Sequence, residues 1–195
     1  MHALQVEAYV AKILGREPHQ LSETEIVLLR LAAILHDIGR LEITDNHARL
    51  GAEIVAEWLS GAPRDRLTRQ QKSSVLEMIA AHSNKGQAES NFSLAVLKDA
   101  DTLDEIGVMS IFMCSNWIDK QSPFFFHDLR QRLLEFEIPF CEEKMEILNT
   151  KAAREILTEK RAFIENFIVQ LENELEADQQ IEPLLRNPRA NGSYR

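Results

Sequence analysis

Apolar residues recur every three or four positions along most of the chain, which is the spacing of one face of an α-helix. Residues 2–14 carry this pattern through His2, Val6, Tyr9 and Ile13, and Gly15 closes the segment. No stretch alternates convincingly with a period of two, so the pattern predicts an all-α fold. The same spacing predicts further helices over about 47–60, 69–83, 93–108 and 150–175, with a helical continuation over 109–120.

Helix boundaries are predicted by capping residues. Ser22 with Glu25 and Thr68 with Gln71 have the spacing of capping boxes, and Thr150 can cap the long last helix. Ser122-Pro123 has the form of an N-cap followed by proline at the first helical position. Ile138-Pro139 predicts a break. The helical stripes are expected to bury Trp58, Val108 and Phe163, and the run Ile26–Ile38, apolar on almost every face, is typical of a central buried helix.

Composition narrows the class of protein. The 195 residues carry 22 Lys and Arg against 31 Asp and Glu, a net charge of −9. Such a surface repels phosphate backbones and anionic lipid, so we expect no nucleic-acid polymer and no membrane as partner, while a small anionic ligand held at a metal ion stays possible. Cys114 and Cys141 have no CxxC spacing and indicate a reducing compartment without disulfides. With no apolar run of about 18 residues, a cytoplasmic protein is expected.

Histidines and aspartates lie on the apolar stripes. They are His2, His36, His47, His82 and Asp101, with Asp37 next to His36. A single histidine of this kind usually sits in the core with its hydrogen bonds satisfied, but a buried carboxylate without a cation costs several kcal/mol. Several such side chains together, with hardly any Lys or Arg beside them, favour a divalent cation. Imidazole and carboxylate ligands suit Mn, Fe, Ni, Zn or Co and tolerate Mg.

The order of these residues resembles that of the HD-domain metal-dependent phosphohydrolases. The resemblance is carried by Leu31–Gly39 (LAAILHDIG), which contains the His-Asp dyad, and by Leu97–Gly107 (LKDADTLDEIG). It implies that the metal ligands are His2, His36, Asp37 and Asp101. It also implies a helical bundle with C-terminal helices packed on it. This bundle is expected to form a single domain over 1–178, with the ligand helices in 1–120 and further helices in 121–178. Residues 179–195 are expected to form a polar tail.

Two further stretches extend the resemblance to about residues 2–175. The segments around His47 and His82 are similar to those of subfamilies with a second metal, so these histidines are expected to bind a second ion or to contact phosphate. Residues 143–163 are similar to the C-terminal helices of small bacterial nucleotide pyrophosphohydrolases. The implied function is hydrolysis of a small phosphate ester, most of all a nucleotide, by an enzyme of the pyrophosphohydrolase or phosphatase type. One tight ion and a weaker second site fit that type.

Candidate roles follow for the residues around the dyad. Asp37 can orient or deprotonate a water, and His47 or His82 can protonate the leaving oxygen. Arg40 and Lys85 either offset phosphate charge or are solvated loop cations. Asp104, three residues after Asp101, either orients a ligand histidine or is an ordinary surface carboxylate. The aromatic residues Trp117 and Phe124–Phe126 are expected in the core or in a homodimer contact, and less so as a platform for a nucleobase.

Two other classes of function remain open. The HD array also resembles that of iron oxygenases with a di-iron site, which would need all six ligand-type side chains. A non-catalytic regulatory or binding module could keep the same helices, but such modules usually lose one or more ligands, and this chain retains the set.

Overall fold

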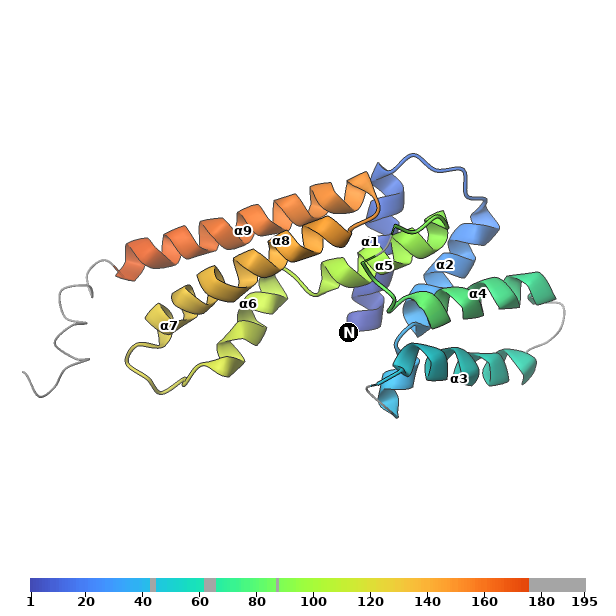
Figure 1. The fold of residues 1–195 in the computed structure, drawn as a ribbon, viewed down its shortest axis with the longest axis horizontal. Helices are drawn as coiled ribbons and strands as arrows, with labels where there is room; N and C mark the ends of the chain where they lie inside the picture. The colour runs from blue at the N-terminus through green and yellow to red at the C-terminus, as the bar shows by residue number, and fades with distance from the viewer. Residues whose placement is uncertain (43–44, 62–65, 87, 176–195) are drawn as a thin grey trace, which may run out of the picture. The chain divides into compact units, whose positions relative to one another are not determined.

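The computed structural model describes residues 1–42, 45–61, 66–86 and 88–175, and these residues form helices with no strand among them. The predicted all-α fold is confirmed (Figure 1). The elements are α1 (His2–Arg16), α2 (Glu23–Leu35), the 3₁₀ turn η1 (Ile38–Leu41), α3 (His47–Gly61), α4 (Arg69–Ala81), α5 (Phe92–Asp104), α6 (Val108–Cys114), the 3₁₀ turn η2 (Ser115–Trp117), α7 (Phe125–Arg132), the π-helical turn η3 (Leu133–Glu137), α8 (Ile138–Ile147) and α9 (Lys151–Leu175).

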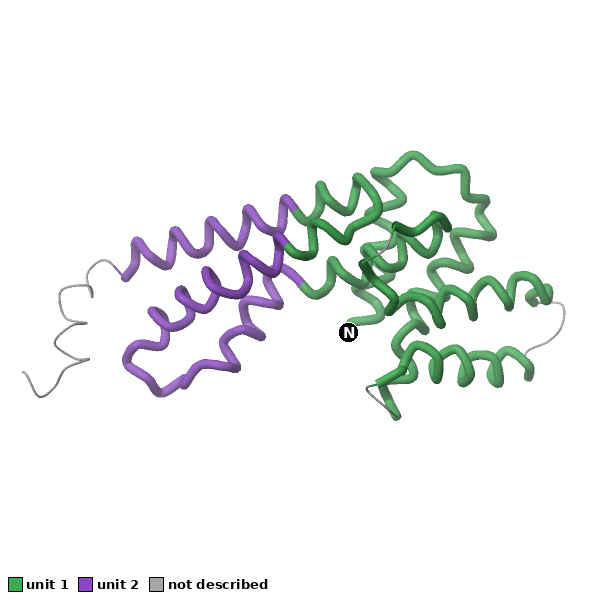
Figure 2. Tube along the Cα trace, in the orientation of Figure 1, with its two compact units in different colours: residues 1–105, 143–157 green, residues 106–142, 158–195 purple. Residues whose placement is uncertain are grey.

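The chain separates into two compact units (Figure 2). The first unit holds residues 1–105 and 143–157, and the second holds 106–142 and the chain from 158 onward. The helix α9 therefore starts in the first unit and continues in the second. These limits differ from the expected subdivision at residue 120, while the extent of a single domain over 1–178 stays a prediction. The expected polar tail, 179–195, lies outside the described residues.

The core of the first unit is built around α5. Helix α1 packs on α2 and α5, and α4 packs on α2 and α3. Nine consecutive residues of α5, 95–103, are buried, although Lys98, Asp99 and Asp101 are among them. Each of these charges has a partner: Lys98 donates to Glu89 at 2.8 Å, and the Asp101 carboxylate lies among histidines and Lys85. Burial of charge in this helix is therefore compensated side chain by side chain.

Asp99 joins α5 to the start of α9. Its carboxylate accepts hydrogen bonds from the backbone N–H groups of Asn149 and Thr150, at 2.9 and 2.7 Å, and from both of their side chains. The hydroxyl of Thr150 in turn accepts from the N–H of Ala153 at 3.2 Å, so the predicted cap of the last helix is confirmed. Because this cap is held by a buried carboxylate, the first turn of α9 is fixed against the helix that carries Asp101.

Both predicted capping boxes are present. Ser22 accepts from the N–H of Glu25, whose carboxylate accepts from the N–H of Ser22, and Thr68 and Gln71 make the same pair of bonds at the start of α4. Local sequence thus determined where α2 and α4 begin.

Several expectations about helices are wrong. Helix α2 is not buried on all sides, because Val27 and Ile34 form an exposed stripe. Trp58 and Phe163 are exposed as well, since α3 turns Val55 and Leu59 inward and α9 turns Ile164 and Ile168 inward. Two neighbouring stripes of one helix can both satisfy the 3.6-residue spacing, and the packing partner selects between them.

The second unit corrects three further expectations. Val108 belongs to α6 and is exposed, because α5 ends at Asp104. Helix α7 begins at Phe125, and Ser122 accepts a bond from the N–H of Phe124, so it closes a turn before the helix. Pro139 does not interrupt the helical structure, because it lies in the first turn of α8, directly after η3. The wider π-helical turn leaves room for a ring that has no N–H and crowds the preceding carbonyls.

A close crossing of backbones holds η1 against α3. Gly39 is buried, and a Cβ atom there would overlap the carbonyl oxygen of His47 and lie 2.7 Å from the backbone nitrogen of Gly51. A Cβ at Gly51 would lie 3.3 Å from the nitrogen of Gly39. Two glycines therefore allow the turn that follows His36 and Asp37 to touch the first turns of the helix that carries His47.

Among the described residues, no helix combines the length and the apolar character that crossing a membrane requires.

We expect Gly39→Ala to lower the free energy of unfolding by about 1–3 kcal/mol, because the added methyl group meets backbone atoms that cannot rotate away. Urea denaturation followed by circular dichroism measures the loss. Gly15→Ala is the matched control, since a Cβ at this helical position has no atom within 4 Å beyond its chain neighbours and the backbone of its own helix. It should leave stability unchanged or raise it by up to about 1 kcal/mol. Equal effects of the two substitutions would contradict the close crossing.

Candidate metal centre

The His36-Asp37 dyad lies where α2 ends and η1 begins. His36 follows the last residue of α2 and is fully buried, and Asp37 precedes the first residue of η1 with a φ of −104°. The Nδ1 atom of His36 is 2.7 Å from the carbonyl oxygen of Ala33, to which it donates. This bond leaves Nε2 of His36 facing the interior of the cluster. The dyad thus occupies a helix end, where the chain turns between the two side chains.

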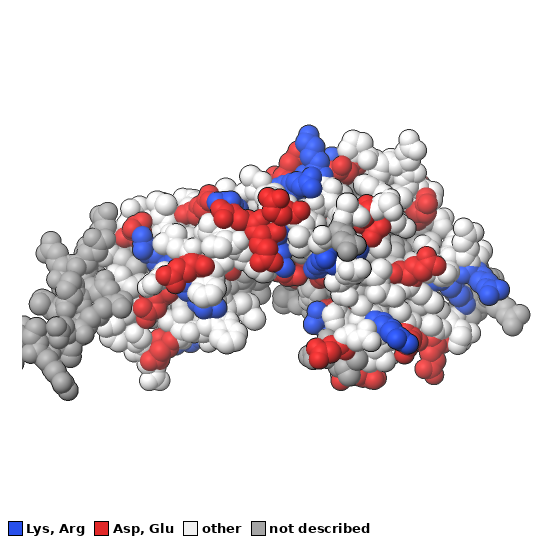
Figure 3. All heavy atoms as spheres, viewed as in Figure 1, with Lys and Arg blue, Asp and Glu red and all other residues white. Residues whose placement is uncertain are grey.

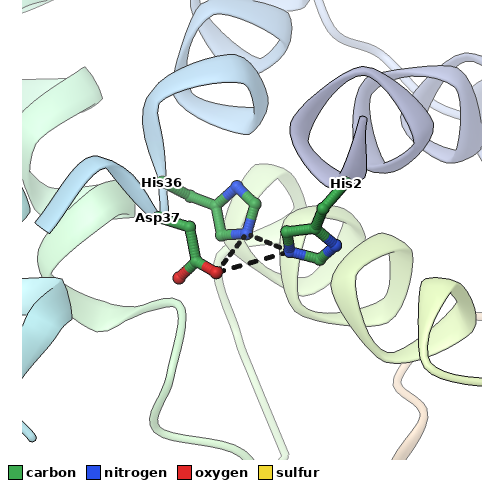
Figure 4. Close-up of side chains that lie close together, drawn as sticks. All are labelled: His2, His36 and Asp37. Atoms are coloured by element: carbon green, nitrogen blue, oxygen red, sulfur yellow. Dashed lines mark hydrogen bonds and ion pairs between the residues drawn. The ribbon is translucent and has the colours of Figure 1, made fainter. Parts of the chain in front are cut away.

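His2 comes from the first turn of α1 and is half-exposed. Its Nδ1 lies 2.7 Å from Oδ2 of Asp104, and its Nε2 points toward His36 and Asp37 (Figure 4). Asp104 and Asp101 share one face of α5. Of the two roles left open for Asp104, the structure therefore has it holding the ring of His2, as outer carboxylates hold metal-binding histidines.

Four donor atoms converge at this point. His2 Nε2 lies 3.1 Å from His36 Nε2, 3.3 Å from Asp101 Oδ1 and 3.4 Å from Asp37 Oδ2. His36 Nε2 lies 3.4 Å from Asp101 Oδ1 and 3.8 Å from Asp37 Oδ2. Two ligands bound to one ion at about 2.1 Å are ~3.0–3.4 Å apart in octahedral or tetrahedral coordination. The spacing of these four atoms is close to that of a coordination sphere.

A second group forms around the other oxygen of Asp37. Oδ1 lies 3.1 Å from Nε2 of His47 and 3.4 Å from Nε2 of His82, and the two imidazole nitrogens are 3.4 Å apart. His82 follows the last residue of α4 and donates from Nδ1 to the carbonyl of Ile79 at 2.7 Å. Both histidines are buried, and Asp37 presents one oxygen to each group.

The arrangement of the donor atoms suits a bound cation better than it suits hydrogen bonds among these side chains. Oδ1 of Asp37 is buried and accepts no hydrogen bond. With their Nδ1 atoms donating to carbonyl oxygens, His36 and His82 turn the lone pairs of Nε2 inward. Lone pairs and carboxylate oxygens facing each other repel, and a positive ion among them removes the repulsion. Three overlapping triads, each drawn from these six side chains, have donor atoms within 4.8 Å of one another.

The pKa values of the cluster follow from the same contacts. Hydrogen bonds to Asp101 and Asp37 raise the pKa of His2 to about 10. Burial alone would raise the pKa of Asp37 and of Asp101, but hydrogen bonds from His2 and the other histidines, together with the nearby charges of Arg40 and Lys85, outweigh it and hold both carboxyl groups well below their usual range. Without a metal ion, a protonated His2 therefore supplies part of the positive charge that these carboxylates face.

A cleft of about 460 Å³ opens onto the cluster. It is lined by five of the six donor residues and by Arg40, Ser83, Lys85 and Glu105. Arg40 is exposed and donates from Nε to Oδ2 of Asp37 at 2.6 Å. Lys85 donates to Oδ2 of Asp101 at 2.8 Å and to Glu105 at 2.9 Å. Both predicted cations thus lie at the cleft, and each is paired with a carboxylate that also faces the histidines.

Two participants had not been predicted from the sequence. Glu105 pairs with Lys85 and, through its other oxygen, with Lys144 at 3.2 Å. The position of Glu105, four residues after Asp101, is a helical signal that could have suggested it. Nothing in the sequence pairs Lys144 with Glu105. Burial would lower the pKa of Lys85, but Asp101 and Glu105 raise it, so the ammonium stays charged.

The remaining candidates lie elsewhere in the chain. Trp117 and Phe124–Phe126 belong to the second unit, whereas all six donor residues belong to the first. His19 and His127, to which no role was given, are not part of the triads.

Comparisons with solved structures agree on the fold. An HD-superfamily hydrolase from Bacillus thuringiensis is similar with a TM-score of 0.62 and 21% identity, over 90% of this chain and 85% of its own. A predicted HD-superfamily hydrolase from an uncultured Thermotogales bacterium gives 0.60 and 22%, over 89% and 79% of the two chains. YpgQ of Bacillus subtilis, solved in complex with ADP, gives 0.59 and 21%, over 90% and 85%.

Among curated proteins, no significant match is found. The family model of the HD domain matches residues 1–106, which contain all six donor residues and more than half of the chain. HD domains bind divalent metal ions. By this match and by its fold, the chain belongs to the HD domain family.

Proposed function

We propose that this protein is a metal-dependent phosphohydrolase that acts on a small phosphate ester, and that this ester is a nucleotide. The buried oxygen of Asp37 carries the proposal: it has no hydrogen bond and lies between two imidazole nitrogens, as a metal-binding carboxylate does. The fold shared with HD-superfamily hydrolases supports the reaction class.

Two ions of unequal affinity suit the donor atoms. His2, His36, Asp37 and Asp101 would hold the tight ion, with four donors that include two carboxylates. His47, His82 and the second oxygen of Asp37 would hold a weaker one. Mixed nitrogen and oxygen donors fit Mn, Fe, Co, Ni or Zn better than Mg. A bound ion of this kind makes a water more acidic and offsets charge on phosphate oxygens.

The side chains around the cleft supply orientation and charge. The low pKa of Asp37 makes it a weak base, so it orients water in the cleft rather than taking its proton. His47 lines the cleft and is less enclosed than His82, which favours it as the group that protonates the leaving oxygen when the second ion is absent. Arg40 and Lys85 are positioned to add positive charge at a phosphate.

The size and charge of the surface favour a compact substrate. A cleft of about 460 Å³ is in the range of small-molecule sites. On the face in Figure 3, acidic side chains are more abundant than basic ones, which are scattered among them, and such a surface suits a nucleic-acid polymer poorly. The ADP bound to YpgQ supports a nucleotide as the ligand of this related fold.

An oxygenase with two iron ions is the second candidate, because all six ligand-type side chains converge. Turnover by the iron-loaded protein would then consume oxygen, which turnover by a phosphohydrolase would not do.

The first test is a panel of nucleoside phosphates and simple phosphoesters with Mg, Mn, Fe, Co, Ni and Zn. We expect release of phosphate or pyrophosphate, with a transition-metal ion at least as effective as Mg. Asp37→Ala should lower metal content per chain and reduce turnover more than ~100-fold with helix content retained, because it removes a donor from both groups. Asp45→Ala, at an exposed carboxylate near the site in sequence, should change neither. Full metal occupancy in Asp37→Ala would refute the assignment.

The double substitution His47→Ala with His82→Ala tests the number of tightly bound ions. If one ion is tight, elemental analysis of protein purified at limiting metal finds the same stoichiometry as in the wild type while turnover falls. A decrease from two ions to one would instead establish two tight sites.

Metal binding should release a proton from His2. Because the pKa of this imidazole is about 10 in the metal-free cluster, it is protonated at pH 7–9, and an ion at Nε2 has to displace that proton. The apparent affinity should therefore rise about tenfold per pH unit in this window and level off above pH 10. Calorimetry in buffers of different ionisation enthalpy counts the protons. His2→Ala should release about one fewer per ion; an equal count in both proteins would show that His2 is not a ligand.

The same shift affects the stability of the metal-free protein. The raised pKa of His2 means that its stabilising contribution is complete below about pH 6.5 and is lost as pH rises through about 10.

A further inference from the structure

Helix α6 in the second unit has its more hydrophobic side in solvent. It buries Ser110, Ile111 and Cys114, and the hydroxyl of Ser110 bonds to the buried carboxylate of Glu137. The opposite side carries Val108, Met109, Phe112 and Met113, of which Phe112 is 66% and Met113 is 62% exposed. A helix at the surface of a globular unit normally has the reverse arrangement, with polar residues outside.

The apolar surface continues beyond α6. The four exposed residues have the spacing i, i+1, i+4 and i+5, so they form one stripe. Trp117, which is 78% exposed, follows Met113 by four residues in η2. The guanidinium carbon of Arg132 lies 5.8 Å from the centre of the Trp117 ring and 4.4 Å from that of Phe136, which is also exposed. We call these seven residues the α6 face: Val108, Met109, Phe112, Met113, Trp117, Arg132 and Phe136.

The size of the α6 face matches one side of a protein interface. For its six apolar residues, applying the exposed fractions to typical residue areas gives an exposed area of roughly 700 Å². Apolar patches on monomers are usually a few hundred Å², and a standard interface buries about 800 Å² on each partner. The composition, which is Met, Phe, Trp and Arg, is also the one enriched at interface cores.

Charge indicates which partner fits. Residues 106–118 contain no charged side chain, although the whole chain has a net charge of −9. Two copies of so acidic a protein repel each other over most of their surfaces, and an uncharged face is where they can meet without like charges in contact. A partner that binds mainly through charge would find no complementary charge along α6.

We propose that the α6 face is the surface through which two copies of this chain associate about a two-fold axis. In a two-fold dimer the same patch serves both partners, so α6 of one copy packs on the α6 face of the other. Arg132 is partly exposed beside Trp117 and Phe136, at the edge of this apolar contact. This inference concerns the second unit and does not depend on the proposed reaction.

Sedimentation equilibrium of the full chain tests the dimer. The wild type should have twice the monomer mass of 22.3 kDa at micromolar concentration. Phe112→Glu puts a charge into the apolar centre of both copies, and each dimer contains the change twice. We expect it to raise the dimer dissociation constant by at least ~100-fold, with an unchanged circular dichroism spectrum and melting temperature. Val169→Glu, at an exposed apolar residue of α9 outside the α6 face, should leave the dimer intact.

Three results would overturn the proposal. They are a wild-type chain that is monomeric at 100 µM, a Phe112→Glu protein that remains as dimeric as the wild type, and dissociation by Val169→Glu to the same extent. Should Phe112→Glu prove unfolded, Met113→Lys takes its place, with the same expected loss of the dimer. A monomeric wild type that co-sediments with phosphatidylcholine vesicles, with binding lost in these variants, would assign the face to a lipid surface instead.

Discussion

The arrangement of helices in the first unit depends on the side chain of Asp37. Its two oxygens face different groups of imidazoles, with Oδ2 toward His2 and His36 and Oδ1 toward His47 and His82. Each of these histidines comes from a different helix or helix end, so α1, α2, α3 and α4 must all arrive within a few ångströms of one carboxylate. A displacement of any one of them leaves a buried oxygen or a buried lone pair without a positive partner, which is costly in a dry interior.

Much of the surrounding structure serves to hold that arrangement. The contact between Gly39 and Gly51 lets η1 approach α3, and without it His47 could not lie beside Asp37. Asp104 holds the ring of His2, and backbone carbonyls hold those of His36 and His82. Outer contacts of this kind fix the tautomer and direction of a metal-binding imidazole, so the donor atoms are oriented before an ion arrives.

The cations of the cleft are also tied to this cluster. Lys85 joins Asp101 to Glu105, and Lys144 binds the other oxygen of Glu105, so the charge on Asp101 is connected to residues far away in sequence. Lys85 therefore has a structural task even without substrate. An ammonium group has three N–H donors, and two are used by these carboxylates, which leaves one that a phosphate oxygen can accept. Lys85 can in this way hold the carboxylate of Asp101 and bind a substrate phosphate at the same time.

The sequence by itself determined the helical class, the caps of α2, α4 and α9, and the six residues that form the cluster, because these depend on local spacing and on the energetic cost of burying His and Asp. Tertiary structure decided the features that depend on contacts between helices. It selected Leu59 over Trp58 for burial, let the π-helical turn carry the chain past Pro139, made α5 the central helix, and brought Lys144 to Glu105. It also left the apolar side of α6 exposed. Within a single helix, either of two adjacent apolar stripes can face inward at the same local energy, and only the surface that packs on the helix decides between them. In the same way, a single charged side chain finds its partner only when the fold brings another element beside it.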